Sequence, residues 1–215
     1  SDTVAKRIST LIQLEHSALK NPIVVTPVRG LIHRIISGLG KEPLLEIEKG
    51  IEIPLEKLIE HLSSLAYMRT DLVERRGEFA VRGGIVDLFL PLAQHPVRID
   101  FFGDEIEELS YFEVADQRTT KAVEGKLAIL PCRELLLTED IKEKALSLVD
   151  KYPLAKEALS RMAEGITTEG MESLIPILIE KTETLFQRVP AGSEVIFIDD
   201  ERVRMRTMDK DNFAT

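Results

Sequence analysis

Two glycine-led turn signals in the middle of the chain constrain its fold more than any other feature. Gly83-Gly84 and Gly103-Asp104 each separate two short runs in which apolar and polar residues alternate. A two-residue loop that begins with glycine joins neighbouring antiparallel strands, because glycine readily adopts positive φ angles there. The sequence therefore predicts an antiparallel meander with strands at 79–82, 85–90, 97–102 and 106–114.

Alternation along residues 97–102 predicts which side chains face solvent. Successive strand residues point to opposite faces of a sheet, so the apolar members of this run form a core face. Arg98, Asp100 and Phe102 then share the other face, and Arg82 lies at the edge of the Gly-Gly turn. Aromatic and arginine side chains are enriched among residues that anchor protein interfaces. The pattern leaves a second interpretation open, in which Phe102 turns inward through a β-bulge or lies under a neighbouring loop.

The charge balance favours a protein partner over nucleic acid. The chain of 215 residues has a formal net charge of −9, the opposite sign from a domain that grips phosphate backbones. No apolar run is long enough to cross a membrane, and no signal peptide pattern is present. Cys132 is the only cysteine, so an intramolecular disulfide is excluded and a reducing cytoplasm fits. We therefore expect a cytoplasmic protein without membrane contacts.

Four runs of the sequence carry a family resemblance. They are Glu-Arg-Arg-Gly-Glu-Phe-Ala-Val-Arg-Gly-Gly-Ile-Val-Asp-Leu-Phe (74–89), His-Pro-Val-Arg-Ile-Asp-Phe-Phe-Gly-Asp-Glu (95–105), Val-Ala-Asp-Gln-Arg (114–118) and Pro-Cys-Arg-Glu-Leu-Leu-Leu (131–137). Together they resemble the UvrB-homology module of bacterial transcription-repair coupling factors, which are large ATP-driven translocases. Repair helicases of the UvrB type share parts of the first two runs. Leu90 stands where these families usually have proline, which is expected to alter only a strand end.

The resemblance implies a partner and a set of contact residues. Coupling factors of this family present the module to UvrA, a subunit of the nucleotide-excision repair machinery. The UvrA-contacting positions of the family fall on Arg82, Arg98 and Phe102, and Arg118 is expected at the rim. We expect both of the first two arginines to pair with UvrA carboxylates, and Phe102 to fill an apolar pocket. A fragment of a UvrB-like repair helicase and a DNA-contacting domain are the alternative interpretations.

Two continuous apolar runs suggest how the chain divides into domains. Ile23–Val25 and Val195–Ile198 are typical of strands buried on both faces of a parallel sheet. The predicted fold class is α+β: residues 43–131 form an antiparallel sheet with a helix, inserted into an α/β body made of 1–42 and 132–215. The resemblance implies that this body is a partial, degenerate helicase-like domain, and that the chain is a fragment. Outside the meander we expect helices at 3–18, 26–36, 54–65, 138–152, 153–163 and 169–180, and a strand at 44–47.

One acidic run resembles part of a nucleotide site. Phe197–Glu201 has the form of a Walker B strand end, but that chemistry also needs a G-x-x-x-x-G-K-[ST] phosphate loop. Gly40-Lys41 and Gly125-Lys126 both lack the leading glycine and the following hydroxyl residue. The four histidines have no second ligand at metal spacing. We therefore expect no catalytic residue, metal or cofactor in this chain. The resemblance assigns ATP, magnesium, RNA polymerase and DNA to other domains of the full-length family members.

Overall fold

The computed structural model of the chain describes residues 2–16, 23–41, 44–190 and 192–208. Helices and strands are mixed along the chain, as expected for an α+β protein. The chain forms two compact units: Ser1–Ser17 with Leu39–Glu169, and Ala18–Gly38 with Gly170–Thr215. This grouping joins helices from both flanks to the central sheet. The domain boundaries expected at 43 and 131 stay predictions, and residue 43 lies outside the described residues.

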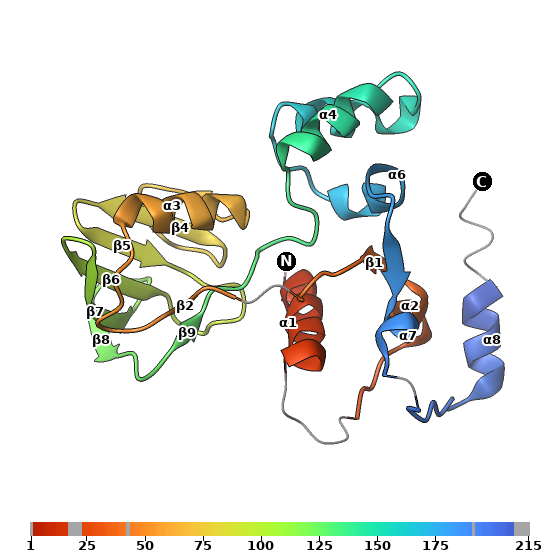
Figure 1. Cartoon of the computed structure of the whole chain (residues 1–215), viewed down its shortest axis with the longest axis horizontal. Coiled ribbons are helices and arrows are strands. Elements are labelled where there is room, and N and C mark those ends of the chain that lie inside the picture. The colour runs from red at the N-terminus through yellow and green to blue at the C-terminus, as the bar shows by residue number, and fades with distance from the viewer. Residues whose placement is uncertain (1, 17–22, 42–43, 191, 209–215) are drawn as a thin grey trace. The chain divides into compact units, whose positions relative to one another are not determined.

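The first unit is built on a six-stranded sheet (Figure 1). Its strands lie side by side in chain order, and the predicted meander is confirmed from β4 to β7. The pairing is antiparallel except between β3 and β4, which run parallel, so a short edge strand that the alternation did not predict makes the sheet mixed. The strands are β3 (Met68–Arg69), β4 (Glu78–Arg82), β5 (Ile85–Leu88), β6 (Val97–Phe102), β7 (Glu105–Phe112) and β8 (Thr119–Ala122).

The two predicted turns exist, but their glycines serve different purposes. Gly83 and Gly103 adopt φ angles of 60° and 61°, which disfavour any side chain with a Cβ atom. Gly84 is not among the positive-φ residues; a Cβ atom there would lie 3.1 Å from the Phe101 carbonyl oxygen. Close approach of β6, and not backbone conformation, therefore requires the second glycine. The strand expected to reach Leu90 ends two residues earlier, and the Leu90 side chain joins the core.

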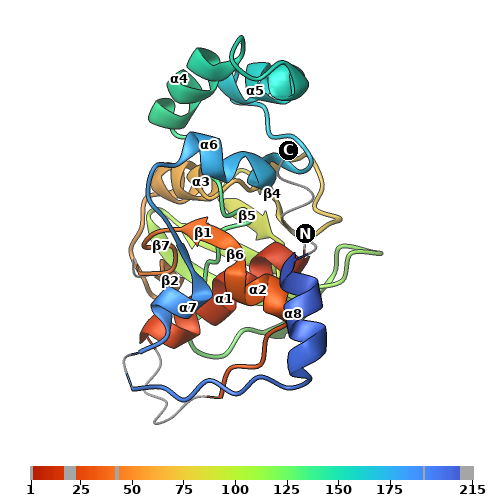
Figure 2. The same ribbon diagram turned by 90° about the vertical axis from the view of Figure 1, so that its right-hand side faces the viewer.

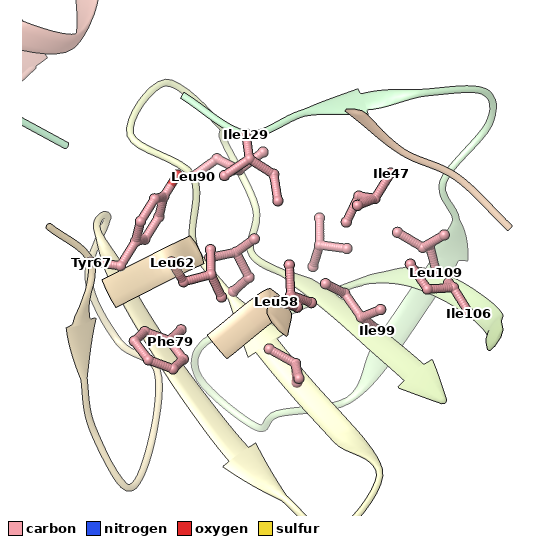
Figure 3. Close-up of a cluster of buried hydrophobic side chains, with 13 residues drawn as sticks. Ile47, Leu58, Leu62, Tyr67, Phe79, Leu90, Ile99, Ile106, Leu109 and Ile129 are labelled. Carbon is pink, nitrogen blue, oxygen red and sulfur yellow. The ribbon is translucent and has the colours of Figure 1, made fainter. Parts of the chain in front are cut away.

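One helix covers one face of the sheet. Helix α3 (Leu55–Ser64) presents Leu58 and Leu62, both fully buried, to the apolar side chains of the strands (Figure 3). A short antiparallel pair, β2 (Glu46–Ile47) with β9 (Leu127–Ala128), borders this core. Burial of a Leu, Ile or Phe side chain contributes about 1.5–3 kcal/mol, so this cluster supplies the main stabilisation of the sheet. Its other buried members are Ile47, Tyr67, Phe79, Val86, Leu88, Leu90, Val97, Ile99, Ile106, Leu109 and Ile129.

Helices from both flanks belong to the same unit. Helix α1 (Asp2–His16) is tied to the segment after β9 by an ion pair, with 3.1 Å between Arg7 Nε and the buried Glu134 carboxylate. The predicted end of this helix at residue 18 lies outside the described residues. Helices α4 (Glu139–Leu148) and α5 (Lys156–Ala163), the second preceded by the 3-10 turn η1 (Pro153–Ala155), pack against each other (Figure 2).

The second unit contains short elements. Helix α2 (Val28–Ile32) is followed by β1 (Arg34–Ile36), which pairs with β10 (Thr182–Thr184). Helix α2 also packs against α7 (Leu185–Arg188) and α8 (Asp200–Met208) (Figure 2). The helix expected to reach residue 36 is therefore too long, because the branched pair at its end is used in a strand.

Three other predictions for this unit are wrong. Neither Ile23–Val25 nor Val195–Ile198 is a strand, and Ile23 and Ile198 are among the most exposed apolar residues. No described strand pairs with either run, so apolar composition alone does not produce the expected parallel sheet. The helix expected at 169–180 starts later, because Gly170 has a φ of 76°, and it is divided into η2 (Met171–Leu174) and α6 (Ile175–Leu178), where Pro176 has no amide hydrogen to continue the preceding turn. No helix in the described ranges is long and apolar enough to cross a membrane.

Candidate partner-binding surface

The sheet face opposite α3 carries a row of polar residues across three strands. Asp87 of β5 lies directly between Ala80 of β4 and Arg98 of β6, and Ser110 of β7 follows Arg98. Only 1% of the Asp87 side chain is exposed, so a carboxylate is buried in the middle of this face. A buried carboxylate needs positively charged partners to offset its lost hydration.

Arg98 is the principal partner of that carboxylate. Its Nε lies 2.7 Å from Asp87 Oδ1 and its Nη2 lies 2.9 Å from Oδ2, a bidentate geometry. Its Nη1 donates to the Gln117 carbonyl at 3.2 Å, and its guanidinium lies 4.9 Å from the centre of the Phe112 ring. The hydrogen bond with Asp87 raises the pKa of Arg98. The expectation that Arg98 is exposed is wrong, because 17% of its side chain is accessible and its donors have partners within the domain.

Arg82 shares the same carboxylate but stays more accessible. It lies opposite Ile85, so Asp87 is its diagonal neighbour on β5, within reach of a long side chain. Its Nη2 contacts Asp87 Oδ2, which Arg98 also contacts. The Arg82 side chain is 48% exposed, and Asp87 is its only ion-pair partner in the described part of the chain. The structure thus brings the two predicted arginines together on one buried acid.

Phe102 lies at the end of β6 and is 77% exposed. A β-bulge does occur here, since the pairing moves from Asp100–Glu108 to Phe101–Ile106 and leaves Glu107 without an opposite residue. The extra residue belongs to β7, so alternation along β6 is preserved and Phe102 does not turn inward. The Phe101 amide donates to the Gly84 carbonyl at 2.9 Å. This bond holds the turn after Arg82 against the strand end that carries Phe102.

Arg118 lies in the segment between β7 and β8. Its side chain is exposed and lies 3.9 Å from the Asp116 carboxylate. The preceding residue, Gln117, has a φ of 60° and donates its side-chain amide to the Val73 and Val114 carbonyls. These bonds hold the carbonyl that accepts from Arg98, so Gln117 is a supporting residue that the sequence pattern did not identify.

A polar hollow next to Arg82 was also missed. It has a volume of about 590 Å³ and is lined by Arg69, Thr70, Asp71, Val81 and Arg82. The Arg69 side chain makes no hydrogen bond or ion pair within the described ranges, and Met68 and Leu72 beside it are exposed. Strand β3 has only two residues and therefore shows no alternation that could have revealed this edge.

Comparison with known proteins identifies the family of the chain that carries this surface. A family model described as the UvrB interaction domain matches residues 45–135, a range that contains all four predicted contact residues. Over 97% of its length the chain is 41% identical to the transcription-repair-coupling factor of Mycobacterium tuberculosis (strain CDC 1551 / Oshkosh). The chain belongs to the transcription-repair-coupling factor family.

Other members of the family match over the same extent. The factor of Myxococcus xanthus is 33% identical over 96% of this chain, and that of Escherichia coli (strain K12) is 29% identical over 99%. The chain spans only 18–19% of the length of these relatives. The resemblance read from the four sequence runs is thereby confirmed, and the residues of the open sheet face belong to an interaction domain of a repair-coupling family.

The acidic run Phe197–Glu201, which resembles a Walker B strand end, belongs to the second unit and not to the unit of the six-stranded sheet. Asp199 and Asp200 pair with arginines of α8, at 3.4 Å to Arg202 and 3.1 Å to Arg204. Cys132 is largely buried, and this burial raises the pKa of its thiol to about 12. A thiol with so high a pKa is not a nucleophile at neutral pH.

Proposed function

We propose that this chain is a non-catalytic recruitment module that binds UvrA through the open face of its six-stranded sheet. The observation that carries this proposal is that the exposed Phe102 ring and the half-exposed Arg82 lie on the same open sheet face, within the range matched by the UvrB interaction domain. Aromatic and arginine side chains are both enriched among the residues that anchor protein interfaces. Phe102 enters an apolar pocket of UvrA, and Arg82 pairs with an acidic group.

The remaining surface residues have secondary roles in this proposal. Arg69 lines the polar hollow next to Arg82 and adds a second positive charge there. Arg98 supports the surface from beneath, since it is already bonded to Asp87 and Gln117. Arg118 lies at the rim, where an exposed charge changes affinity by less than about 1 kcal/mol.

The wider setting of the module is also a proposal. The relatives are named for coupling transcription to repair, and the chain corresponds to under one fifth of their length. In the full-length protein, other domains bind RNA polymerase and DNA and use ATP with magnesium, and the complete protein works in the cytoplasm. The two flanks, 1–42 and 132–215, are part of a degenerate helicase-like domain that carries residues 43–131 as an insertion. The module itself requires no cofactor.

The experiment that tests the proposal is a calorimetric titration of purified UvrA with the chain and two variants, Arg82→Ala and Phe102→Ala. Removal of a desolvated anchor is expected to weaken binding by about 2–4 kcal/mol, which corresponds to about 30- to 1000-fold. Circular dichroism checks that each variant is folded.

Two matched variants serve as controls. Arg161→Ala and Leu154→Ala remove an arginine and a large apolar side chain from exposed positions on α5 and η1 of the same unit. Both are expected to bind like the unmodified chain. If folded Arg82→Ala and Phe102→Ala also bind like the unmodified chain, the interface lies elsewhere. Absence of any UvrA binding would refute the recruitment function.

A further inference from the structure

Asp87 is a buried acid that the sequence assigns to no role, yet it contacts two of the predicted partner-binding residues. We propose that Asp87 is a positioning residue: it fixes the Arg82 guanidinium in the orientation that receives an acidic group of the partner, while Arg98 locks Asp87 in place. This inference rests on the proposed UvrA-binding function. It assigns different roles to the two arginines, since Arg82 binds the partner and Arg98 holds Asp87, the residue that orients Arg82.

The contacts of the two arginines are unequal. Arg98 spans both oxygens of Asp87, donates to the Gln117 carbonyl and lies over the Phe112 ring. Four contacts from three elements leave it little freedom to move toward a partner. Arg82 has a single contact with Asp87, through one of its nitrogens. Its remaining N–H groups, on a side chain that is half exposed, are available to donate hydrogen bonds to an anion of a partner.

The charges of Asp87, Arg82 and Arg98 together favour an acidic group on the partner. One carboxylate, Asp87, is shared by two guanidinium groups, so the cluster keeps one positive charge in excess. Because Arg98 is largely buried and Arg82 is half exposed, that excess is accessible at Arg82. An Asp or Glu side chain of the partner neutralises it and can use the planar fork of the guanidinium. Asp100 of the same face lies opposite Glu108 and interacts electrostatically with Arg98, but it makes no hydrogen bond or ion pair with Arg82.

A purely structural ion network is the competing explanation. Buried ion pairs frequently stabilise a fold weakly or not at all, so their presence alone is no sign of function. The two explanations differ in how Asp87 and Arg82 combine. A positioning residue acts on binding only through the residue it positions, whereas a structural residue changes affinity independently of Arg82.

The test is a double-mutant cycle read as affinity for purified UvrA. Asp87→Asn keeps the shape of the side chain and removes its charge. We expect it to weaken binding by more than about tenfold, as for a disrupted charge pair at an interface. When Arg82 is already replaced by alanine, the same change is expected to alter affinity by less than about threefold. Equal losses in both backgrounds, or unchanged affinity of folded Asp87→Asn, would overturn the inference.

Glu78→Gln is the matched control. Glu78 is also a buried carboxylate of this sheet, but it accepts from the Glu74 and Arg75 amides at 2.9 and 2.8 Å and does not touch Arg82. It is expected to bind like the unmodified chain. If Asp87→Asn does not fold, the cycle is run with Asp87→Glu instead, which keeps the charge but moves the carboxylate. A loss of more than about fivefold that disappears in the Arg82→Ala background supports positioning, and unchanged affinity or an equal loss in both backgrounds contradicts it.

A partner-free measurement separates this inference from the proposed function. NMR relaxation of the arginine Nε–H groups is expected to show Arg98 rigid and Arg82 partly ordered in the unmodified chain, and Arg82 more mobile in Asp87→Asn. Equal mobility of Arg82 in both proteins would refute positioning, whether or not UvrA binds. Absence of UvrA binding combined with the expected mobility change would refute the recruitment function and leave the positioning of Arg82 by Asp87 intact.

Discussion

The two faces of the six-stranded sheet differ in composition and in exposure to solvent. The face under α3 is apolar and covered, with side chains such as Phe79 and Ile99 completely removed from water. The opposite face has a small apolar cluster of Val73, Ala80, Phe89 and Phe112, and beside it the buried Asp87 with its arginines. Hydrophobic burial is concentrated on the first face, so the second is free to carry charge and an exposed aromatic ring.

This difference separates stability from recognition. Substitutions under α3 are expected to change the free energy of unfolding and to leave the affinity of the folded protein unaltered. Substitutions toward the exposed end of the open face are expected to weaken the affinity for UvrA and to leave the free energy of unfolding unaltered. Substitutions at Phe112 and Asp100, which lie between the core and the exposed end, are expected to change both the free energy of unfolding and the affinity by small amounts.

Leu58→Ala is expected to give the largest loss of stability. Leu58 is a fully buried residue of α3 that packs on the sheet, and truncation of a buried leucine leaves a cavity that costs about 2–5 kcal/mol. Urea unfolding followed by circular dichroism measures the loss. Leu146→Ala, at an exposed leucine of α4, is the control and is expected to change the free energy of unfolding by less than about 0.5 kcal/mol. A folded Leu58→Ala variant with weakened UvrA binding would contradict the separation of the faces.

The sequence predicted the covered face better than any other part of the molecule. Alternation in 97–101, two glycine turns and the helix at 54–65 all favoured one arrangement, and local signals that agree in this way specify a fold strongly. The same alternation placed Arg98 correctly on the open face. It could not show the acid that holds Arg98, because the contact with Asp87 depends on strand register between β5 and β6.

Predictions failed where a segment depended on distant partners. Ile23–Val25 and Val195–Ile198 have the composition of buried strands, but a strand forms only when another strand pairs with it. Strand β1 was predicted as the end of a helix because its partner β10 is far away in the sequence. Exposure of Phe102 could be predicted only in part. Alternation along β6 indicated that the side chain is exposed, but the sequence could not show that the bulge lies on β7 and so leaves this alternation intact.

Phe112→Leu tests the apolar support of the open face. The Phe112 ring is fully buried under the Arg98 guanidinium, at 4.9 Å, and a cation–π contact of this kind contributes about 0.5–2 kcal/mol. We expect the free energy of unfolding to fall by about 1–2 kcal/mol. Phe79→Leu is the control, since Phe79 is also fully buried and no cation–π contact to its ring occurs among the described residues. Equal losses in the two variants would show that packing alone, without the guanidinium, accounts for the effect.

Asp100→Asn is expected to stabilise the protein slightly at neutral pH. Partial burial, together with Glu108, Asp87 and Glu107 and against the effect of Arg98, raises the pKa of Asp100. A carboxyl whose pKa is raised by folding favours the folded state at low pH, and this contribution is lost as the pH rises through the folded-state pKa. The variant's advantage should therefore be present at pH 7 and disappear below about pH 3.9, where both side chains are neutral. Urea unfolding at both pH values measures it, and a less stable variant at pH 7 would contradict the prediction.

Phe102→Ala is expected to have the smallest effect on stability and so gives the sharpest contrast between the faces. The ring is 77% exposed and its strand pairs through the backbone, so the free energy of unfolding should change by less than about 0.5 kcal/mol. Thermal and urea unfolding measure this change beside Leu58→Ala. A loss near that of Leu58→Ala would mean that the ring packs against the domain in solution, and that the open face is organised for stability after all. An unchanged unfolding curve would leave recognition as the reason for an exposed aromatic ring at this end of the sheet.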